Sequence, residues 1–214
     1  MSNLTAFDLD HTLIRGNVSF LFGAHLFRRK QIALLPMIAC VGLYLAHKLF
    51  GLSMVTLHRE ALKRLFLGVS ADQMRGEVSI FLDRSFDKFL YPPAVTALRT
   101  AQRAGSKVVL LSNSPDFLVE AVAKRLGSDA WRASEYRVDS QGRLCGLVHV
   151  LQGRDKARDL IAFARGWAIP RNAITAYSDS FLDIPFLEAA GHAVAVNPDR
   201  HLRAYSRTKN WPII

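Results

Sequence analysis

Three short apolar runs in this 214-residue chain break off abruptly into polar residues. Residues 5–7 run into Asp8 and Asp10, residues 107–111 run into Ser112, and residues 173–177 run into Ser178 and Asp179. A short apolar run is typical of a strand that is buried on both faces of a parallel sheet. Ligands of such sheets bind just beyond the carboxyl ends of the strands. The pattern therefore predicts an α/β fold whose polar groups meet at one edge of a parallel sheet.

The order of the predicted elements divides the chain into two parts. Residues 1–14 and 92–214 alternate strands with helices, which predicts a Rossmann-like parallel sheet with right-handed crossovers. Residues 15–91 interrupt this core and look helical throughout, and Ser70 and Gln73 fit the start of a helix that runs to about residue 90. The length of the chain is sufficient for one core with a sizeable insertion. We therefore expect an all-helical insertion, here called the cap, on an α/β core.

Asp8 and Asp10 stand one residue apart at the end of the first predicted strand. Two carboxylates in that position repel each other and lose hydration unless a positive charge lies between them. Mg²⁺ is the usual partner because it prefers hard oxygen ligands, whereas an acidic turn in solvent is the alternative. Lys156 at a predicted helix start, together with Asp179 and Asp183 after the third run, favours a charged site over a solvated turn.

In their order along the chain, these segments resemble the four motifs of the haloacid dehalogenase-like (HAD) phosphohydrolase superfamily. Its motifs are a DxDx[TV] strand end, a strand-end Ser or Thr, a Lys, and a strand end with paired acids. The matching residues are Asp8, Asp10, Thr12, Ser112, Lys156, Asp179 and Asp183. The second Asp of the first motif implies a phosphatase or phosphotransferase, because the halide that leaves in a dehalogenase needs no proton.

The resemblance implies a role for each catalytic group. Asp8 would be the nucleophile that forms an aspartyl-phosphate, and Asp10 would protonate the leaving oxygen and then activate water. Lys156 would neutralise charge on the phosphoryl group and on Asp8. Ser112 and the main-chain N–H of Asn113 would bind phosphoryl oxygens.

The resemblance also implies a Mg²⁺ site. Its ligands would be Asp8, the main-chain carbonyl of Asp10, and Asp179. Asp183 and Thr12 would orient these ligands without binding the metal themselves. Four carboxylates against one lysine leave a net charge of about −3. A divalent cation is therefore expected to bind before a phosphate dianion can approach.

The cap contains a long uncharged stretch, residues 31–47, between Arg28-Arg29-Lys30 and Lys48. Two interpretations are open. The stretch is a central cap helix that is buried on every side, or it dips into a membrane from the cytoplasmic face, bent at Pro36 and Gly42. As a helix it spans roughly 25 Å, a little short of the hydrocarbon core of a bilayer.

Positive charge collects in the same region. Residues 15–64 hold eight Lys and Arg residues against a single Glu, a net +7 of the chain's +10. Basic residues beside an apolar helix suit an anionic lipid surface, and no nucleic-acid-binding motif accompanies them, so we expect no nucleic-acid partner. The two cysteines have no metal or redox spacing. Because Asp8 lies near the start of the sequence without a basic segment before it, we expect no signal peptide. We also expect a cytoplasmic core with peripheral contact at the inner face of the membrane.

The substrate is predicted less directly. Residues 14–23 contain no acid, although phosphoserine phosphatases usually have a Glu in this region that binds the substrate amine, and Leu182 replaces the Asn of their fourth motif. The pattern resembles the subfamily IB hydrolases, which implies a phospholipid headgroup phosphate of the phosphatidylglycerophosphate type. A soluble phosphatase of phosphoserine or a similar small metabolite is one alternative. A non-catalytic, membrane-associated module that binds phosphate is the other.

Overall fold

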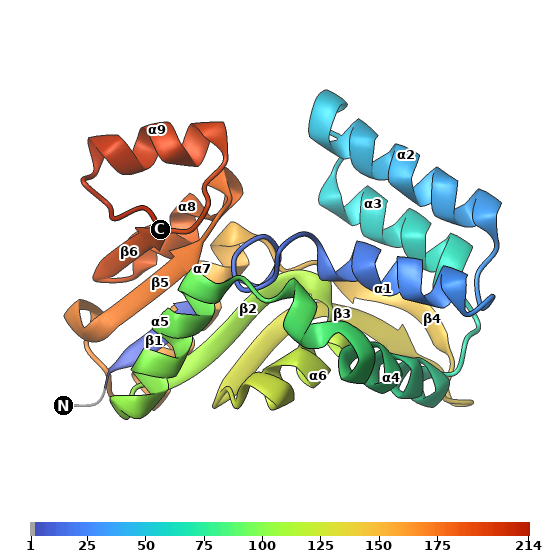
Figure 1. Cartoon of the computed structure of the whole chain (residues 1–214), viewed down its shortest axis with the longest axis horizontal. Coiled ribbons are helices and arrows are strands. Elements are labelled where there is room, and N and C mark those ends of the chain that lie inside the picture. The colour runs from blue at the N-terminus through green and yellow to red at the C-terminus, as the bar shows by residue number, and fades with distance from the viewer. Residues whose placement is uncertain (1–2) are drawn as a thin grey trace.

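The computed structural model describes residues 3–214, apart from the side chain of Lys48. Within these residues a six-stranded sheet has the order β4-β3-β2-β1-β5-β6 (Figure 1). The strands are β1 (Leu4–Phe7), β2 (Lys107–Pro115), β3 (Ala130–Val138), β4 (Leu144–His149), β5 (Ile174–Ser178) and β6 (His192–Ala195). All neighbouring strands are parallel except β3 and β4, which form an antiparallel hairpin. The predicted α/β fold with a Rossmann-like, mostly parallel sheet is confirmed.

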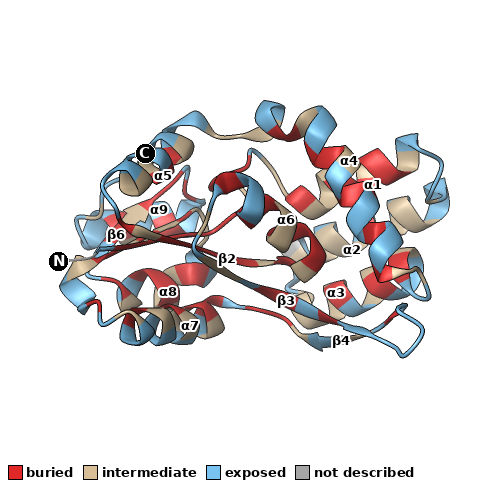
Figure 2. Cartoon of the chain, turned by 90° about the horizontal axis from the view of Figure 1, so that it is seen from below, coloured by how far each residue is buried: buried red, intermediate tan, exposed pale blue. Residues whose placement is uncertain are grey.

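Alternate residues of the central strands enter two separate cores. Phe7 and Leu110 belong to one cluster of buried side chains, whereas Ala6 and Val109 belong to the other. Helices α5 (Pro92–Arg103) and α6 (Asp116–Leu126) cover the first face, and α7 (Gly153–Gly166) and α8 (Ile184–Ala189) cover the second (Figure 2). Two short 3-10 turns (Arg171–Ala173 and Phe181–Asp183) and α9 (Arg200–Thr208) complete the core. Both faces of the sheet are therefore covered, which explains the continuous apolar runs of β1 and β2.

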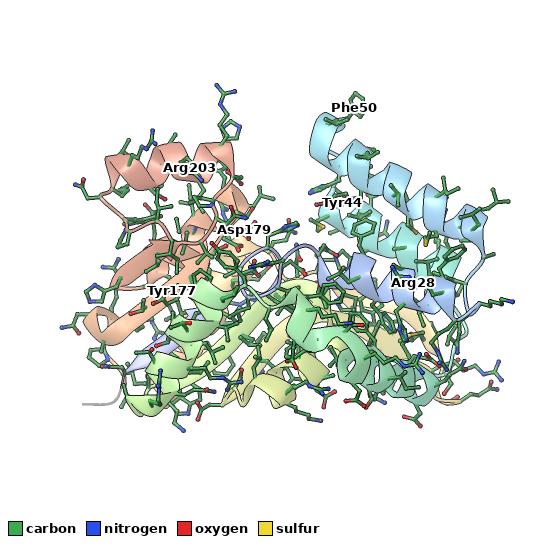
Figure 3. The ribbon with its side chains drawn as sticks, viewed as in Figure 1. Arg28, Tyr44, Phe50, Tyr177, Asp179 and Arg203 are labelled. Atoms are coloured by element: carbon green, nitrogen blue, oxygen red, sulfur yellow. The ribbon has the colours of Figure 1, made fainter. Side chains whose placement is uncertain are left out.

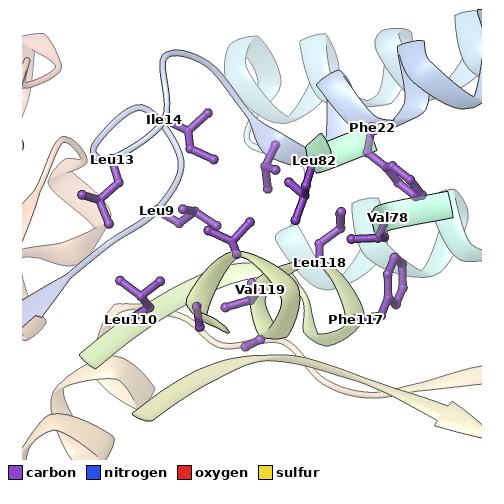
Figure 4. Packing of buried hydrophobic residues seen from close by; sticks show 14 of the residues in the cluster. Leu9, Leu13, Ile14, Phe22, Val78, Leu82, Leu110, Phe117, Leu118 and Val119 are labelled. Carbon is purple, nitrogen blue, oxygen red and sulfur yellow. The ribbon is translucent and has the colours of Figure 1, made fainter. Parts of the chain in front are cut away.

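The insertion between β1 and α5 is helical, as the sequence predicts. It consists of α1 (Val18–Arg28), α2 (Leu34–Phe50), α3 (Met54–Ala61), a π-helical turn (Leu62–Phe66) and α4 (Ala71–Phe89). Ser70 caps α4 by accepting a hydrogen bond from the Gln73 N–H. Phe22 of α1 and Val78 of α4 pack in the same cluster as Phe117 of α6 (Figure 4). The cap thus shares an apolar core with one face of the sheet, which fixes its position over the strand ends.

Helix α2 corrects one expectation for residues 31–47. The helix begins at Leu34 and lies on the outside of the cap (Figure 1), and the side chains of Leu35 and Phe50 are 79% and 84% exposed. The interpretation of a helix buried on every side is therefore wrong. Pro36 lies in the first turn, where the missing N–H has no acceptor within the helix, so it imposes no bend. None of the described helices is both long enough and apolar enough to cross a bilayer.

A second correction concerns the end of β2. Ser114 and Pro115 look like the first residues of a helix, but β2 continues through Pro115 and α6 begins at Asp116. The Ser114 hydroxyl donates to Asp10 instead of capping α6. Helix α6 ends at Leu126, and Gly127 follows it in the left-handed conformation at a φ of 68°.

Candidate active site

The carboxyl ends of three adjacent strands bring the predicted residues together. Because β1 lies between β2 and β5 in the sheet, Asp8 follows β1 beside Asn113 of β2 and beside Asp179, which follows β5. Asp179, labelled in Figure 3, marks this edge of the sheet. The three residues line a cavity of about 890 Å³, together with Asp10 and Lys156. Side chains far apart in the sequence therefore face one space between the core and the cap.

Lys156 is the buried cation of this site. Its Nζ lies 2.8 Å from Oδ1 of Asp8 and 2.7 Å from Oδ2 of Asp183. The hydroxyl of Ser178 donates to the same oxygen of Asp183 at 2.7 Å. The first turn of α7 holds Lys156 here because Gly153 approaches Leu182 closely, where a Cβ would lie 2.1 Å from the carbonyl oxygen. The backbone of α7 is thus packed directly against the turn that carries Asp183.

Asp10 is oriented by two hydrogen bonds. Its Oδ1 accepts from the Val18 N–H at 2.6 Å, at the start of α1, and its Oδ2 accepts from the Ser114 hydroxyl at 2.7 Å. Ser114 is a residue that the sequence reasoning missed. Its position two residues after Ser112 in an extended strand could have indicated it, since alternate residues of a strand point to the same side.

The remaining predicted residues lie around this centre. Thr12 donates to Oδ1 of Asp179 at 3.2 Å. Asn113 lines the cavity. Ser112 is fully buried behind it, where its hydroxyl accepts from the Ser114 N–H at 3.1 Å. The binding of phosphoryl oxygens by Ser112 and Asn113 stays a prediction.

Burial and mutual repulsion dominate the electrostatics. Loss of hydration raises the pKa of Asp8 well above its usual value, although Lys156 acts in the opposite direction. The same loss of hydration, with repulsion from Asp183, raises the pKa of Asp179 to about 7. Burial also raises the pKa of Asp10, against the hydrogen bonds from Ser114 and Val18. Lys156 loses hydration too, but the two carboxylates beside it outweigh that loss and raise its pKa. The site is therefore short of positive charge.

These residues fit a bound Mg²⁺ ion. Within residues 3–214, no three or more His, Cys, Asp or Glu side chains are clustered as a ready chelate. Mg²⁺ does not require such a cluster, because it keeps several waters and takes only one or two carboxylates from a protein. Asp8 and Asp179 offer two carboxylates whose pKa values are raised by burial and by neighbouring carboxylates, an effect that Lys156 offsets only in part. The main-chain carbonyl of Asp10, two residues after Asp8, is a third candidate oxygen.

Comparison with known proteins places the chain among hydrolases. A family model described as haloacid dehalogenase-like hydrolase matches residues 5–188. A protein of Streptomyces azureus, named for inhibition of morphological differentiation, is 32% identical over 73% of this chain, which spans 57% of that protein. A Mycobacterium tuberculosis protein named "Probable phosphatase" is 30% identical over 97% of this chain and 73% of its own length. Another protein of the same organism, named phosphoserine phosphatase, is 28% identical over 97% of this chain and 68% of its own length.

Solved structures repeat the fold. A Bordetella pertussis protein of unknown function matches with a TM-score of 0.87 at 21% identity, over 100% of this chain and 99% of its own. A phosphoserine phosphatase described as a phospho-aspartyl intermediate analogue matches with a TM-score of 0.71 at 18% identity, over 99% of this chain and 92% of its own. At these identities the likeness concerns the fold, and it includes the helical cap as well as the sheet.

Proposed function

Because this chain belongs to the haloacid dehalogenase-like hydrolase family and is a phosphatase within it, we propose that it hydrolyses phosphomonoesters through an aspartyl-phosphate at Asp8. The observation that carries the proposal is the buried group of Asp8, Asp10 and Lys156 beside Asp179. A nucleophile, a proton donor and a cation lie in one cavity, which is the set that phosphoryl transfer requires.

In the first step, an oxygen of Asp8 attacks phosphorus and the bond from phosphorus to the leaving oxygen breaks. Asp10 gives its proton to that oxygen, and the burial that raises the pKa of Asp10 favours the protonated form that this step requires. In the second step, Asp10 takes a proton from water, whose oxygen attacks the phosphorus of the aspartyl-phosphate. The bond from phosphorus to Asp8 then breaks, which releases inorganic phosphate and restores the carboxylate.

Lys156 acts in both steps by its charge. Its ammonium group lies 2.8 Å from the Asp8 oxygen and offsets the negative charge that gathers when a phosphate dianion approaches a carboxylate. Asp183 and the Ser178 hydroxyl hold the ammonium group in place. We propose that Asp8, the Asp10 carbonyl and Asp179 hold Mg²⁺, which would supply further positive charge to the phosphoryl oxygens.

We propose further that the leaving group is a phospholipid headgroup. The described cap residues that line the catalytic cavity, among them Asn17, Tyr44 and Ser53, include no carboxylate and no guanidinium. A free amino acid such as serine would find charged partners only on the core side of the cavity, where Arg154 and Asp155 lie, and none on the cap side. The glycerol unit next to the phosphorylated oxygen of a lipid headgroup needs only hydroxyl contacts on the cap side.

The outer face of α2 supports a lipid substrate. Exposed apolar side chains recur every three or four residues along it, which places them in one stripe: Leu34, Ile38, Val41, Leu45 and Leu49. Arg28, Arg29 and Lys30 lie just before the helix. We propose that this stripe rests on an anionic membrane surface, where apolar side chains enter the interface and the basic residues meet lipid phosphates.

Phosphate release decides between the lipid and the amino acid. One preparation with Mg²⁺ is assayed on phosphatidylglycerophosphate in mixed micelles and on phosphoserine in solution, with Asp8→Asn as the control. We expect faster release from the lipid, and a loss on the order of 10³-fold or more in Asp8→Asn. Faster release from phosphoserine would contradict the proposed lipid substrate but not the phosphatase activity.

Sedimentation with phosphatidylglycerol vesicles tests the membrane contact. Leu45→Ser with Leu49→Ser removes two exposed apolar side chains of this stripe and should weaken binding about tenfold or more. Val148→Ser on β4, where the side chain is also more than half exposed, is the matched control and should bind as the wild type does. Equal binding by all three proteins would exclude α2 as the contact.

A phosphatase of phosphoserine or a similar small metabolite is the second candidate, because one relative carries that name. The assay on phosphoserine tests it directly. We do not propose the third interpretation, a non-catalytic module. The chain belongs to a family of enzymes, and Asp8, Asp10 and Lys156 line one cavity.

A further inference from the structure

A second cavity, of about 250 Å³, lies inside the cap next to the catalytic cavity. Helices α1, α2 and α3 form most of its wall, and the end of β2 closes it on the side of the sheet. Asn17, Tyr44, Met54 and Asn113 line both cavities. The cap cavity therefore borders the space in which the leaving group of a bound phosphomonoester would lie.

The wall of the cap cavity is apolar and carries no ionised side chain. Phe20, Met37, Val41 and Leu57 contribute to it, and none of its described lining residues is Asp, Glu, Lys or Arg. Such a wall has nothing to offer the ammonium or carboxylate of an amino acid, whereas apolar groups gain free energy by leaving water. Pockets that bind small molecules are lined in this way.

Four of the polar side chains at the wall are already paired with one another. Nδ1 of His58 lies 2.8 Å from the Tyr136 hydroxyl, and the Ser19 hydroxyl lies 3.0 Å from that of Ser114. Burial lowers the pKa of His58 to about 4, so its ring is neutral at pH 7. The pairs therefore satisfy their own hydrogen bonds and do not require a polar occupant.

The surroundings of Gly23 show that there is open space in front of the cavity wall at this position. This residue is buried in α1 and lines the cavity, yet a Cβ added to it would meet no heavy atom within 4 Å outside the helix's own backbone. A buried position with open space in front of it is unusual in a close-packed interior. A larger side chain at residue 23 would occupy the cavity without displacing a neighbour at its Cβ.

We propose that the cap cavity binds the apolar part of the leaving group, an alkyl or acyl chain attached beyond the phosphorylated oxygen. The chain enters past Asn17 and Tyr44 while the phosphate stays at Asp8. This inference rests on the proposed phosphatase function and specifies its substrate class: phosphomonoesters of apolar or amphiphilic alcohols. The cavity adjoins the outer stripe of α2 at Val41, which is partly exposed and also lines the cavity.

Alkyl phosphates of increasing length test the proposal in solution, without a lipid surface. We expect kcat/KM of the wild type to rise about two- to fourfold for each added methylene, and on the order of 50-fold between ethyl and hexyl phosphate. A series in which kcat/KM does not change with chain length would overturn the cavity's role. Release from phosphoserine but from no alkyl phosphate would also overturn it. Absence of release from the whole series, from phosphatidylglycerophosphate and from phosphoserine would instead refute the phosphatase function itself, so the two failures are distinguishable.

Filling the cavity provides the second measurement. Gly23→Leu should lower the ratio of kcat/KM for hexyl phosphate to that for ethyl phosphate about tenfold or more. A ratio is independent of the fraction of folded enzyme, so partial misfolding does not imitate the effect. Gly42→Leu is the matched control, because Gly42 is an exposed helical glycine of α2 with open space around its Cβ, and it should keep the wild-type ratio. An unchanged ratio in Gly23→Leu would show that the chain binds elsewhere.

A short-chain phospholipid separates the two sources of an apolar chain. Dihexanoylphosphatidate is assayed beside hexyl phosphate on the wild type and on Gly23→Leu. Faster release from the phosphatidate, lowered by Gly23→Leu, supports a lipid leaving group in the cavity. Faster release from hexyl phosphate, lowered in the same way, supports a water-soluble alcohol there. Release from both that Gly23→Leu leaves unchanged would overturn the proposal.

Discussion

Ser114 is the neighbour that fixes one oxygen of the Asp10 carboxyl group. A hydrogen bond to a charged group contributes about 1.5–3 kcal/mol, and here it also directs the carboxyl toward the leaving oxygen. We expect Ser114→Ala to lower kcat about tenfold or more with little change in KM, because the binding of substrate does not depend on this hydroxyl. Ser114→Thr keeps a hydroxyl and should retain most of the activity. Steady-state kinetics of the two variants decide the matter, and a loss confined to KM would contradict the assignment.

His58 makes stability depend on pH. Burial lowers its pKa from 6.5 to about 4 in the folded protein, so between these values the unfolded chain binds a proton that the folded chain does not. The free energy of unfolding is then highest above pH 6.5 and falls by about 1.4 kcal/mol per pH unit below it. We expect the wild type to lose about 2 kcal/mol between pH 7.5 and pH 5.

Urea unfolding of the wild type and of His58→Gln at the two pH values measures this difference. The variant lacks the titrating ring, so its stability should fall less over the same interval. A fall of equal size in both proteins would assign the pH dependence to other groups.

The acidic residues of the site could be predicted from the sequence, but their hydroxyl partners could not. Asp8 and Asp179 follow apolar runs, so the rule for parallel sheets brings them together without any knowledge of packing. The hydroxyl of Ser178 reaches Asp183, and that of Ser114 reaches Asp10. The alternation of an extended strand indicates the side on which Ser114 lies. Its contact with Asp10 and that of Ser178 with Asp183 depend on how the strand ends and the turn pack, which no local pattern encodes.

Strands and helices show the same contrast between what the sequence predicts and what only packing decides. The strands and the helical nature of the cap follow from apolar runs and capping residues, which are local. The position of α2 does not, because an apolar helix is compatible both with complete burial and with an exposed face. The structure places one side of α2 against the cap cavity and leaves Leu35 and Phe50 in solvent, an outcome set by the packing of α1 and α3.

The close contact between α7 and the turn at Leu182 predicts that a substitution of Gly153 lowers both stability and activity. A Cβ at Gly153 would lie 2.1 Å from the Leu182 carbonyl oxygen, so Gly153→Ala must push the turn away and move Asp183 from Lys156. Overpacking of this kind costs about 1–3 kcal/mol, and we expect kcat to fall as well. Thermal unfolding and kcat of the variant measure both effects.

Gly166 at the other end of α7 is the matched control. It is exposed, and a Cβ there would meet no atom within 4 Å. Gly166→Ala should therefore leave kcat unchanged and keep or raise the stability, because alanine favours the helix. Equal behaviour of the two variants would show that the contact of Gly153 with the turn is unimportant.

At the scale of the whole molecule, the site opposes the stability of the fold. Asp179 is partly buried beside Asp183. Loss of hydration and repulsion from Asp183 raise its pKa to about 7, so its ionisation destabilises the folded state. We expect Asp179→Asn to raise the melting temperature in the presence of a chelator, by an amount that corresponds to at most about 4 kcal/mol. Thermal unfolding at pH 8 in EDTA measures it.

Addition of Mg²⁺ completes this experiment. The wild type should gain stability with the concentration of the ion, because a ligand that binds only the folded state stabilises it. Asp179→Asn should respond weakly and should lose activity. A variant that responds to Mg²⁺ as strongly as the wild type would remove Asp179 from the proposed metal ligands.

The strand order has a consequence for the chain while the ribosome makes it. The central strand β1 ends at Phe7, but its two partners begin only at Lys107 and Ile174. At about 5–20 residues per second, synthesis separates β1 from its first partner by on the order of 5–20 s. During that time both edges of the apolar strand β1 are unpaired. The cap cannot yet pack on α6, because α6 has not been synthesised. Early recruitment of a chaperone to the nascent chain is the natural protection for this order of assembly.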